Sequence, residues 1–195
     1  MGIRVTVEPT VEPITLTQAK SHLRVDSTAD DDLITALIKS ARRSAEIETN
    51  RSLITQTLQL TMCNWPSYRG VIELPRSRVQ SISSVKYTDT GGTQQTISAS
   101  NYQIDLTVDP ARLAPVYDYT WPSVQSDTFE AVEITYVAGY GDAGSDVEPE
   151  IVQAMYLMLT HLYENRSAVA CEGNPVEVPM GAKFLLAHHR VPYSM

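Results

Sequence analysis

Residues 15–57 constrain the fold more than any other part of the chain, because their pattern predicts two helices followed by a strand. Thr15 and Gln18 form a capping box, in which a hydroxyl and an amide bind the unpaired backbone N–H groups at the start of a helix. We therefore expect a short helix over about residues 16–24. Almost nothing in residues 15–57 has a pattern typical of catalysis.

A second helix should begin at Asp30, Asp31 and Asp32, whose negative charges suit the positive N-terminal end of the helix dipole. Its apolar residues recur on one side of a helix that turns by about 100° per residue. This apolar stripe consists of Leu33, Ile34, Leu37, Ile38, Ala41 and Ala45, and we expect the other side to carry Lys39, Arg42, Arg43 and Glu46.

Glu48 also falls on the apolar stripe of the second helix. An unpaired carboxylate in such a position is costly, so we expect Glu48 to hold a cation, either Arg51 or Arg24. A structural ion pair that closes the helix end is the better interpretation than a catalytic acid.

After Leu53 the apolar period changes from helical to two residues, the pattern of a half-buried strand. Leu58, Leu60 and Met62 alternate with polar neighbours, and residues 3–8 alternate in the same way. Further extended segments are expected at 71–74, 79–87, 94–97, 102–106 and 132–137, with a hairpin turn at 89–92. These short strands predict an antiparallel β unit, not βαβ crossovers.

Helix returns at Pro149, which suits the first helical position because it lacks an N–H that would be unpaired there. The helix is expected to continue for over four turns. Ala154 and Leu157 extend its apolar character beyond the main stripe, and a helix of this kind usually packs on two sides. We therefore expect Ala154 and Leu157 to contribute to a subunit interface. A last short helix is expected at about residues 181–189.

The composition argues against direct binding of nucleic acid. The chain has 195 residues, a net charge of −8 and a pI near 4.9, whereas binding to phosphates depends on Lys and Arg. Cys63 and Cys171 are isolated, which fits free thiols better than a disulfide framework. No apolar run approaches the length of a membrane span and no secretory leader is recognisable, so we expect a soluble protein without membrane contact.

Gly139, Gly141 and Gly144 spell G-x-G-x-x-G after an expected strand, the sharpest enzyme-like signal in the chain. A dinucleotide site needs the third glycine at the helix start, but here the helix waits until Pro149, and nearby carboxylates would repel a phosphate. A turn between sheet and helix is the better interpretation. The alternative is a small nucleotide-binding protein or enzyme that uses the Gly139–Gly144 loop.

Metal binding and other catalytic chemistry have weaker signals. His161, His188, His189 and Cys171 form neither C-x-x-C nor H-E-x-x-H, and the aspartates at 30–32 lack the spacing of a calcium loop. No nucleophile elbow is present. We therefore predict no catalytic residue, no cofactor and no metal.

Six segments in a fixed order carry a resemblance to a known family. They are LTQAKSHLRV, DDDLITALIKSARR, IETNRSLITQT, the β segment with IELPRSRVQSISSVKY and NYQIDL, EITYVAGYGD, and VEPEIVQAMYLMLTHLYENR. In this order they resemble the head-tail connector (adaptor) family of tailed bacteriophages and gene transfer agents, over residues 16 to about 166.

The resemblance implies a non-enzymatic ring protein, expected to be dodecameric, in the head-tail neck of a phage-like particle assembled in the bacterial cytoplasm. Such a ring sits beneath the portal of the filled head and presents a surface to the stopper and tail. DNA would pass through the lumen without specific binding, because an acidic wall avoids the affinity that a basic wall would create.

The resemblance also implies an α+β fold with a helical core from the N- and C-terminal helices and an inserted antiparallel β unit. We expect the helical parts at residues 1–52 and 141–195 and the β region at 53–140. The segment from about residue 175 onward is expected to dock on the portal through Phe184, Leu185, Leu186, Arg190, Val191 and Tyr193. The alternative, that residues 184–186 cover the subunit's own core, stays open.

Overall fold

The structure is a computed structural model that describes residues 1–67, 70–165 and 180–192. It has an α+β fold and separates into two compact units, each built from segments that are distant in sequence. The helical unit comprises residues 10–54 and 141–190, and the sheet unit comprises residues 1–9, 55–140 and the C-terminal end from Val191. Each unit is described by itself below.

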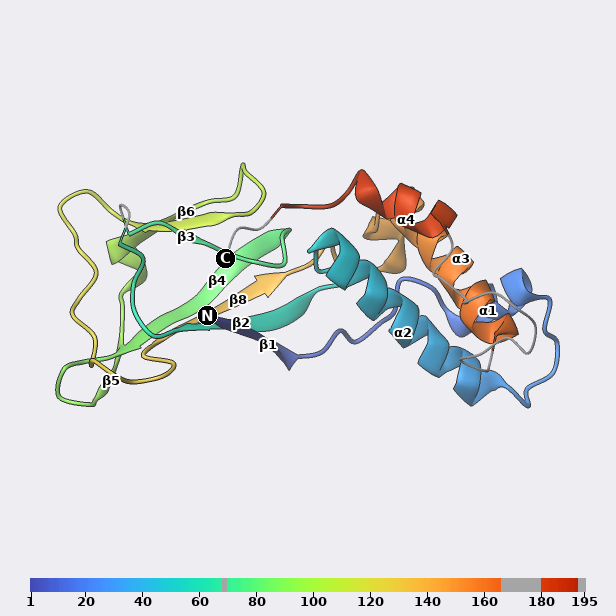
Figure 1. Ribbon diagram of the computed structural model, residues 1–195, viewed down its shortest axis with the longest axis horizontal. Coiled ribbons are helices and arrows are strands. Elements are labelled where there is room, and N and C mark those ends of the chain that lie inside the picture. Colours follow the sequence, from blue (N-terminus) through green and yellow to red (C-terminus); the bar gives the residue numbers. More distant parts are fainter. Residues whose placement is uncertain (68–69, 166–179, 193–195) are drawn as a thin grey trace. The chain divides into compact units, whose positions relative to one another are not determined.

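The helical unit contains four α-helices within the described residues: α1 (Leu16–Leu23), α2 (Asp31–Thr49), α3 (Pro149–Glu164) and α4 (Met180–Ala187). Figure 1 shows α2 beside α3, with α4 against α3. The capping box predicted at the start of α1 is confirmed, since the Gln18 N–H donates to the Thr15 hydroxyl and the Thr15 N–H donates to the Gln18 side chain. Pro149 occupies the first turn of α3, also as predicted.

The helical core combines the buried sides of all four helices. Ile34, Ile38, Ala41 and Ala45 of α2 are buried, so the predicted stripe is confirmed at these positions. The other main contributions come from Ala19 of α1, from Ile151, Met155 and Leu159 of α3, and from Ala182 and Leu186 of α4.

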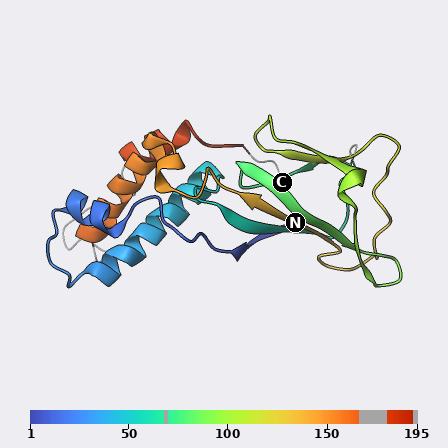
Figure 2. The ribbon, with the colours of Figure 1, turned by 180° about the vertical axis from the view of Figure 1, so that it is seen from behind.

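The sheet unit contains a five-stranded antiparallel sheet in the order β1-β2-β8-β4-β5. Its strands are β1 (Gly2–Val7), β2 (Gln56–Met62), β8 (Val132–Ala138), β4 (Val79–Thr88) and β5 (Gln94–Thr96). The view from behind in Figure 2 shows the same strands from their other side. Because β1 pairs with β2, residues 2–7 belong to the sheet unit and not to the helical part in which we expected them.

A second sheet has the order β3-β7-β6, formed by β3 (Ile72–Glu73), β7 (Arg112–Pro115) and β6 (Tyr102–Asp105). Strand β7 was missed by the sequence analysis, because four residues between Pro110 and Val116 offer too short a pattern. Its pairing with both β3 and β6 makes it the central strand of this sheet.

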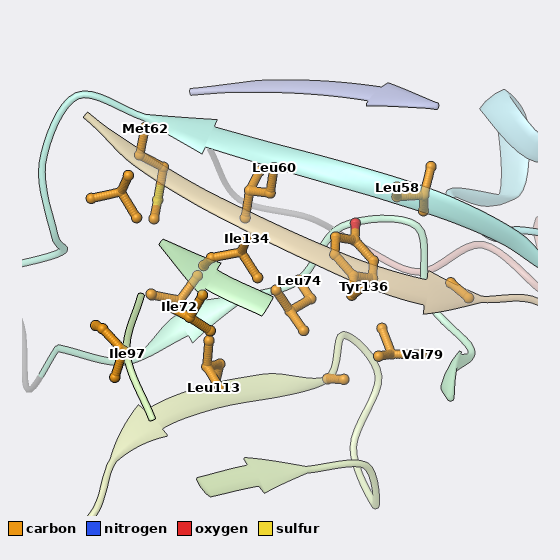
Figure 3. Close-up of a cluster of buried hydrophobic side chains, with 14 residues drawn as sticks. Leu58, Leu60, Met62, Ile72, Leu74, Val79, Ile97, Leu113, Ile134 and Tyr136 are labelled. Carbon is orange, nitrogen blue, oxygen red and sulfur yellow. The ribbon is translucent and has the colours of Figure 1, made fainter. Parts of the chain in front are cut away.

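An apolar core unites the two sheets. Leu58 and Leu60 of β2 and Ile134 of β8 meet Ile72 and Leu113 of the smaller sheet, as the close-up in Figure 3 shows. Tyr136 is also fully buried, and its hydroxyl donates to the Pro75 carbonyl oxygen at 2.6 Å. The predicted alternation along β2 is thus confirmed, with its apolar side chains in this core.

The hairpin predicted at residues 89–92 joins β4 to β5. The Asp89 carboxylate accepts hydrogen bonds from the N–H groups of Gly91 and Thr93 and from the side chain of Gln95. These donors favour the ionised carboxylate, so the Thr93 N–H first and the Gln95 amide second hold the pKa of Asp89 below its usual value.

Candidate assembly surfaces

A charged cluster lies inside the helical unit, where the sequence predicted only a solvent-exposed helix side. Arg42 is 5 % exposed, and its Nε donates to Glu12 Oε2 at 2.8 Å while its Nη1 donates to Glu46 Oε2 at 3.2 Å. Glu46 is 2 % exposed and its other oxygen accepts from the Leu53 N–H. The outward placement predicted for Arg42 and Glu46 is therefore wrong. Glu12, far away in sequence, is a second carboxylate partner of the Arg42 guanidinium, and this contact offsets the cost of burying the two charges.

Glu48 is exposed at the end of α2, so the reason for expecting it to pair with Arg51 is wrong. The buried carboxylate of this helix is Glu46 instead. Arg51 Nε donates to the His189 carbonyl oxygen at 2.7 Å, which links the end of α2 to the segment after α4. The Glu48–Arg51 pair itself stays a prediction.

Polar contacts also join the helices at the other end of this unit. Tyr163 of α3 donates its hydroxyl to the Asp30 carboxylate at 2.7 Å. His22 of α1 lies 3.0 Å from the Thr160 hydroxyl. These contacts fix the start of α2 and the face of α1 relative to α3.

The interface role predicted for Ala154 is withdrawn, because Ala154 is fully buried within the subunit's own helical core. A side chain in that position has no surface left for a neighbour. Leu157 is only partly buried and lies near Gly181 of α4, so its role stays a prediction. Leu162, five residues further along α3, is exposed.

The residues predicted to contact the portal differ in their exposure on and after helix α4. Leu186 is buried in the helical unit, which supports for this residue the alternative that residues 184–186 cover the subunit's own core. Val191, beyond the helix, is also buried. Phe184 is 67 % exposed, Leu185 is partly buried and Arg190 is exposed. Tyr193 lies outside the described residues. The exposed side of α4 is thus much smaller than the predicted docking segment.

A groove of about 440 Å³ lies in the helical unit between the start of α1 and the first turns of α3. Pro13, Val152 and Tyr156 provide apolar lining, and Gln18 and Gln153 provide polar lining. Burial raises the pKa of the Tyr156 phenol. The Tyr156 ring lies 4.6 Å from the His22 ring, so its position is fixed from the side of α1.

Ile47 of α2 is the functional candidate that the sequence analysis missed. Its side chain is 63 % exposed, although it belongs to a long amphipathic helix. Ile47 follows Ile38 by nine positions, which at about 100° per residue places it on the opposite side of the helix. That spacing could have revealed an outward apolar side chain.

Backbone conformation and close contacts explain the glycines of the Gly139–Gly144 loop. Gly139 has a φ of +148° and its N–H donates to the Arg78 carbonyl oxygen. A side chain at Gly141 would collide with the Asp146 carboxylate, and one at Gly144 would collide with the Pro13 carbonyl oxygen. The Asp146 carboxylate also accepts from the Ala143 N–H at 3.0 Å, so an acidic side chain of the chain itself occupies a donor that a phosphate would need.

Other kinds of site have no support in the part of the chain that the structure describes. No group of three His, Cys, Asp or Glu side chains among these residues is arranged to hold a metal ion. The same residues include no helix long and apolar enough to cross a membrane.

Among the described residues, the features that stand out are the exposed helix faces and the groove between α1 and α3. The sequence model of the phage gp6-like head-tail connector protein family matches residues 13–115, more than half of the chain. The protein belongs to this family. It is therefore a structural head-tail connector and not an enzyme.

Solved structures extend the likeness over the whole fold. A chain from the neck of an empty gene transfer agent (GTA) particle, computed with C6 symmetry, has a TM-score of 0.80 at 20% identity, covering 100% of this chain and 98% of its own. A chain from the virion of a native GTA particle has a TM-score of 0.79, and one from the neck of a native GTA particle, computed with C12 symmetry, has 0.78. Both are 19% identical, with 100% of this chain and 98% of each covered. A comparison with curated proteins finds no significant match.

Proposed function

We propose that the protein forms a dodecameric ring in the head-tail neck of a phage-like particle, beneath the portal and above the stopper and tail. The observation that carries this proposal is the full-length likeness of its fold to chains in the necks of GTA particles, one of them computed with C12 symmetry. Family membership supplies the connector role. A heterologous contact repeated by rotation closes into a ring of this kind.

The charge of the chain suits a ring through which DNA passes. With a net charge of −8, the protein offers few cations to displace the counterions of DNA, so a wall built from it would hold the phosphates weakly. This property supports passage of DNA without specific binding. The alternative, a nucleotide-binding enzyme at Gly139–Gly144, is not favoured, because Asp146 and the Pro13 backbone fill that loop.

The exposed side of α4 is the proposed portal contact. Phe184 offers an apolar anchor, and Lys183 and Arg190 are exposed cations nearby in an acidic chain. Large apolar side chains supply much of the affinity in such contacts, while the cations select an acidic partner surface.

Co-expression with the portal protein from the same particle tests the proposal. We expect the connector to co-purify with portal rings at twelve copies per ring, as counted by native mass spectrometry, and to appear below the portal by electron microscopy. Phe184→Asp should reduce this attachment without lowering thermal stability, whereas Leu186→Asp should unfold the helical unit. Absence of any portal-bound ring for the wild-type protein would refute the proposed function.

A further inference from the structure

We propose that the outward side of α2 in one copy docks into the α1–α3 groove of the next copy, with Ile47 seated against Val152 and Tyr156. This inference rests on the proposed ring and names the two surfaces that join its subunits. The occupant of the groove is thus a second copy of this chain.

The outward side of α2 has the character of a helix-packing surface. Ile47 is 63 % exposed, whereas Ile38 on the opposite side is 3 % exposed and faces the core. The other exposed positions around Ile47 include Ala36, Ser40 and Ser44, whose small side chains allow another element to come close.

This side of α2 is also basic. Lys39 and Arg43 are exposed along it, while the one carboxylate between Asp32 and Glu48 is Glu46, which is buried. The chain as a whole has a net charge of −8, so this side of α2, with two cations and no exposed carboxylate between Asp32 and Glu48, has the opposite sign to the chain as a whole.

The segments that form the groove have the opposite charge. Residues 10–18 and 141–156 contain no Lys or Arg and five carboxylates. Glu12 pairs with Arg42 of its own copy, and the other four are Asp142, Asp146, Glu148 and Glu150. The groove therefore combines an apolar lining with an acidic surround, and α2 presents an apolar side chain on a basic surface. Such complementarity favours this pairing over contacts between two like surfaces.

The two surfaces do not overlap on one copy. The groove is lined by residues 12–18 and 143–156 and by none of α2, and Ile47 points away from the side of α2 that packs in the core. One copy can therefore use both surfaces at once. Head-to-tail contacts of this type are the kind that closes into a ring by rotation.

Cross-linking between copies tests the pairing directly. In a background in which Cys63 and Cys171 are replaced by Ser, the double variant Ile47→Cys/Gln153→Cys should form a ladder of covalent oligomers when portal-bound rings are treated with a short bifunctional maleimide. Either cysteine alone should give no ladder. The matched control pair, Phe129→Cys/Gln153→Cys, uses another exposed apolar position and should also give none.

A charge exchange provides an independent readout. Lys39→Glu/Arg43→Glu should reduce ring assembly at least tenfold, and adding Asp142→Lys/Gln153→Lys in the same chain should restore it, because the two surfaces then exchange their signs. Circular dichroism should show a folded protein in every case, since all four side chains are exposed. Ile47→Asp should also reduce assembly at least tenfold, and Phe129→Asp should not.

The outcomes separate this inference from the proposed ring. If wild-type rings form on the portal but the Ile47→Cys/Gln153→Cys variant gives no ladder and the charge exchange gives no rescue, the inference is wrong and the proposed function stands. If wild-type protein forms no ring at all, the proposed function fails, and with it the inference.

Discussion

The two units of this protein differ in what they bury. Within the described residues of the sheet unit, the buried polar side chains are uncharged, namely Gln56, Thr61 and Ser77. The helical unit instead encloses Arg42 and Glu46, with Glu12 as the second partner of Arg42. The sheet unit is thus held together by apolar packing between two sheets. In the helical unit, buried charges hold α2 against the segment that contains Glu12.

This difference predicts different responses to mutation. Replacing one member of a buried ion pair leaves the other charge without compensation, while trimming an apolar core costs packing alone. The chain offers separate probes for the two cases. Both tryptophans, Trp65 and Trp121, lie in the sheet unit, so their fluorescence reports that unit, whereas circular dichroism at 222 nm reports chiefly the helices.

Removal of the buried cation should have the largest effect. Arg42→Met leaves Glu46 buried and should lower the free energy of unfolding of the helical unit by about 3–5 kcal/mol. In urea, the transition followed at 222 nm should move much more than the one followed by tryptophan fluorescence. Lys39→Met, at an exposed position of the same helix, is the control and should change stability by less than about 0.5 kcal/mol.

The double variant Arg42→Met/Glu46→Leu sharpens this test, because it removes both charges inside the helix. We expect it to recover much of the stability lost in Arg42→Met, since apolar replacements of buried ion pairs are often tolerated. If the single and double variants lose the same amount of stability, an uncompensated Glu46 charge is not the cause of the loss.

The corresponding change in the sheet unit is Leu60→Ala. Leu60 is 1 % exposed in the core between the sheets, so its truncation should cost about 2–5 kcal/mol. For this variant, the urea transition followed by tryptophan fluorescence should move to lower urea. The loss of stability should be the same at 0.05 M and 0.5 M salt, because no charge is removed. A larger shift of the helical signal than of the fluorescence signal would contradict the separation of the two units.

Local patterns predicted the elements of this fold well, and the errors arose where distant segments decide the outcome. The capping box at Thr15, the start of α3 at Pro149 and the alternation along β2 depend on near neighbours, and all three are present. Arg42 and Glu46 lie beside the apolar stripe of α2, and their burial depends on Glu12, which no local pattern reveals.

The candidate surfaces were predictable only in part, because they too depend on contacts between distant segments. An exposed Phe184 agrees with the predicted docking segment, but the burial of Ala154 and Leu186 depends on how α3 and α4 pack, which the helical period alone does not determine. The groove near Tyr156 is formed by residues more than a hundred positions apart in sequence, so no local pattern could indicate it.

Loss of the α1 cap should have a smaller effect, confined to the helical unit. Thr15→Ala removes the hydroxyl that accepts from the Gln18 N–H and should cost about 1 kcal/mol, seen at 222 nm. Thr17→Ala, at an exposed position inside α1, is the matched control and should be neutral or slightly stabilising, because Ala is the better helix former. Equal losses in both variants would show that helix propensity, and not the cap, explains the effect.

The smallest expected effect concerns pH and the β4–β5 hairpin of the sheet unit. The folded state holds the pKa of Asp89 below its ordinary value of 3.8, chiefly through the Thr93 N–H and the Gln95 amide. A depressed carboxylate pKa stabilises the fold above the unfolded value, and this contribution disappears as the pH falls through the folded pKa. Asp89→Asn should therefore be less stable than wild type at pH 7, and the difference in Tm should shrink from about pH 5 downward. Thr90→Ala alters the same turn without a titrating group, so its difference from wild type should not vary with pH. A pH-independent difference for Asp89→Asn would show that the turn depends on the shape of the side chain and not on its charge.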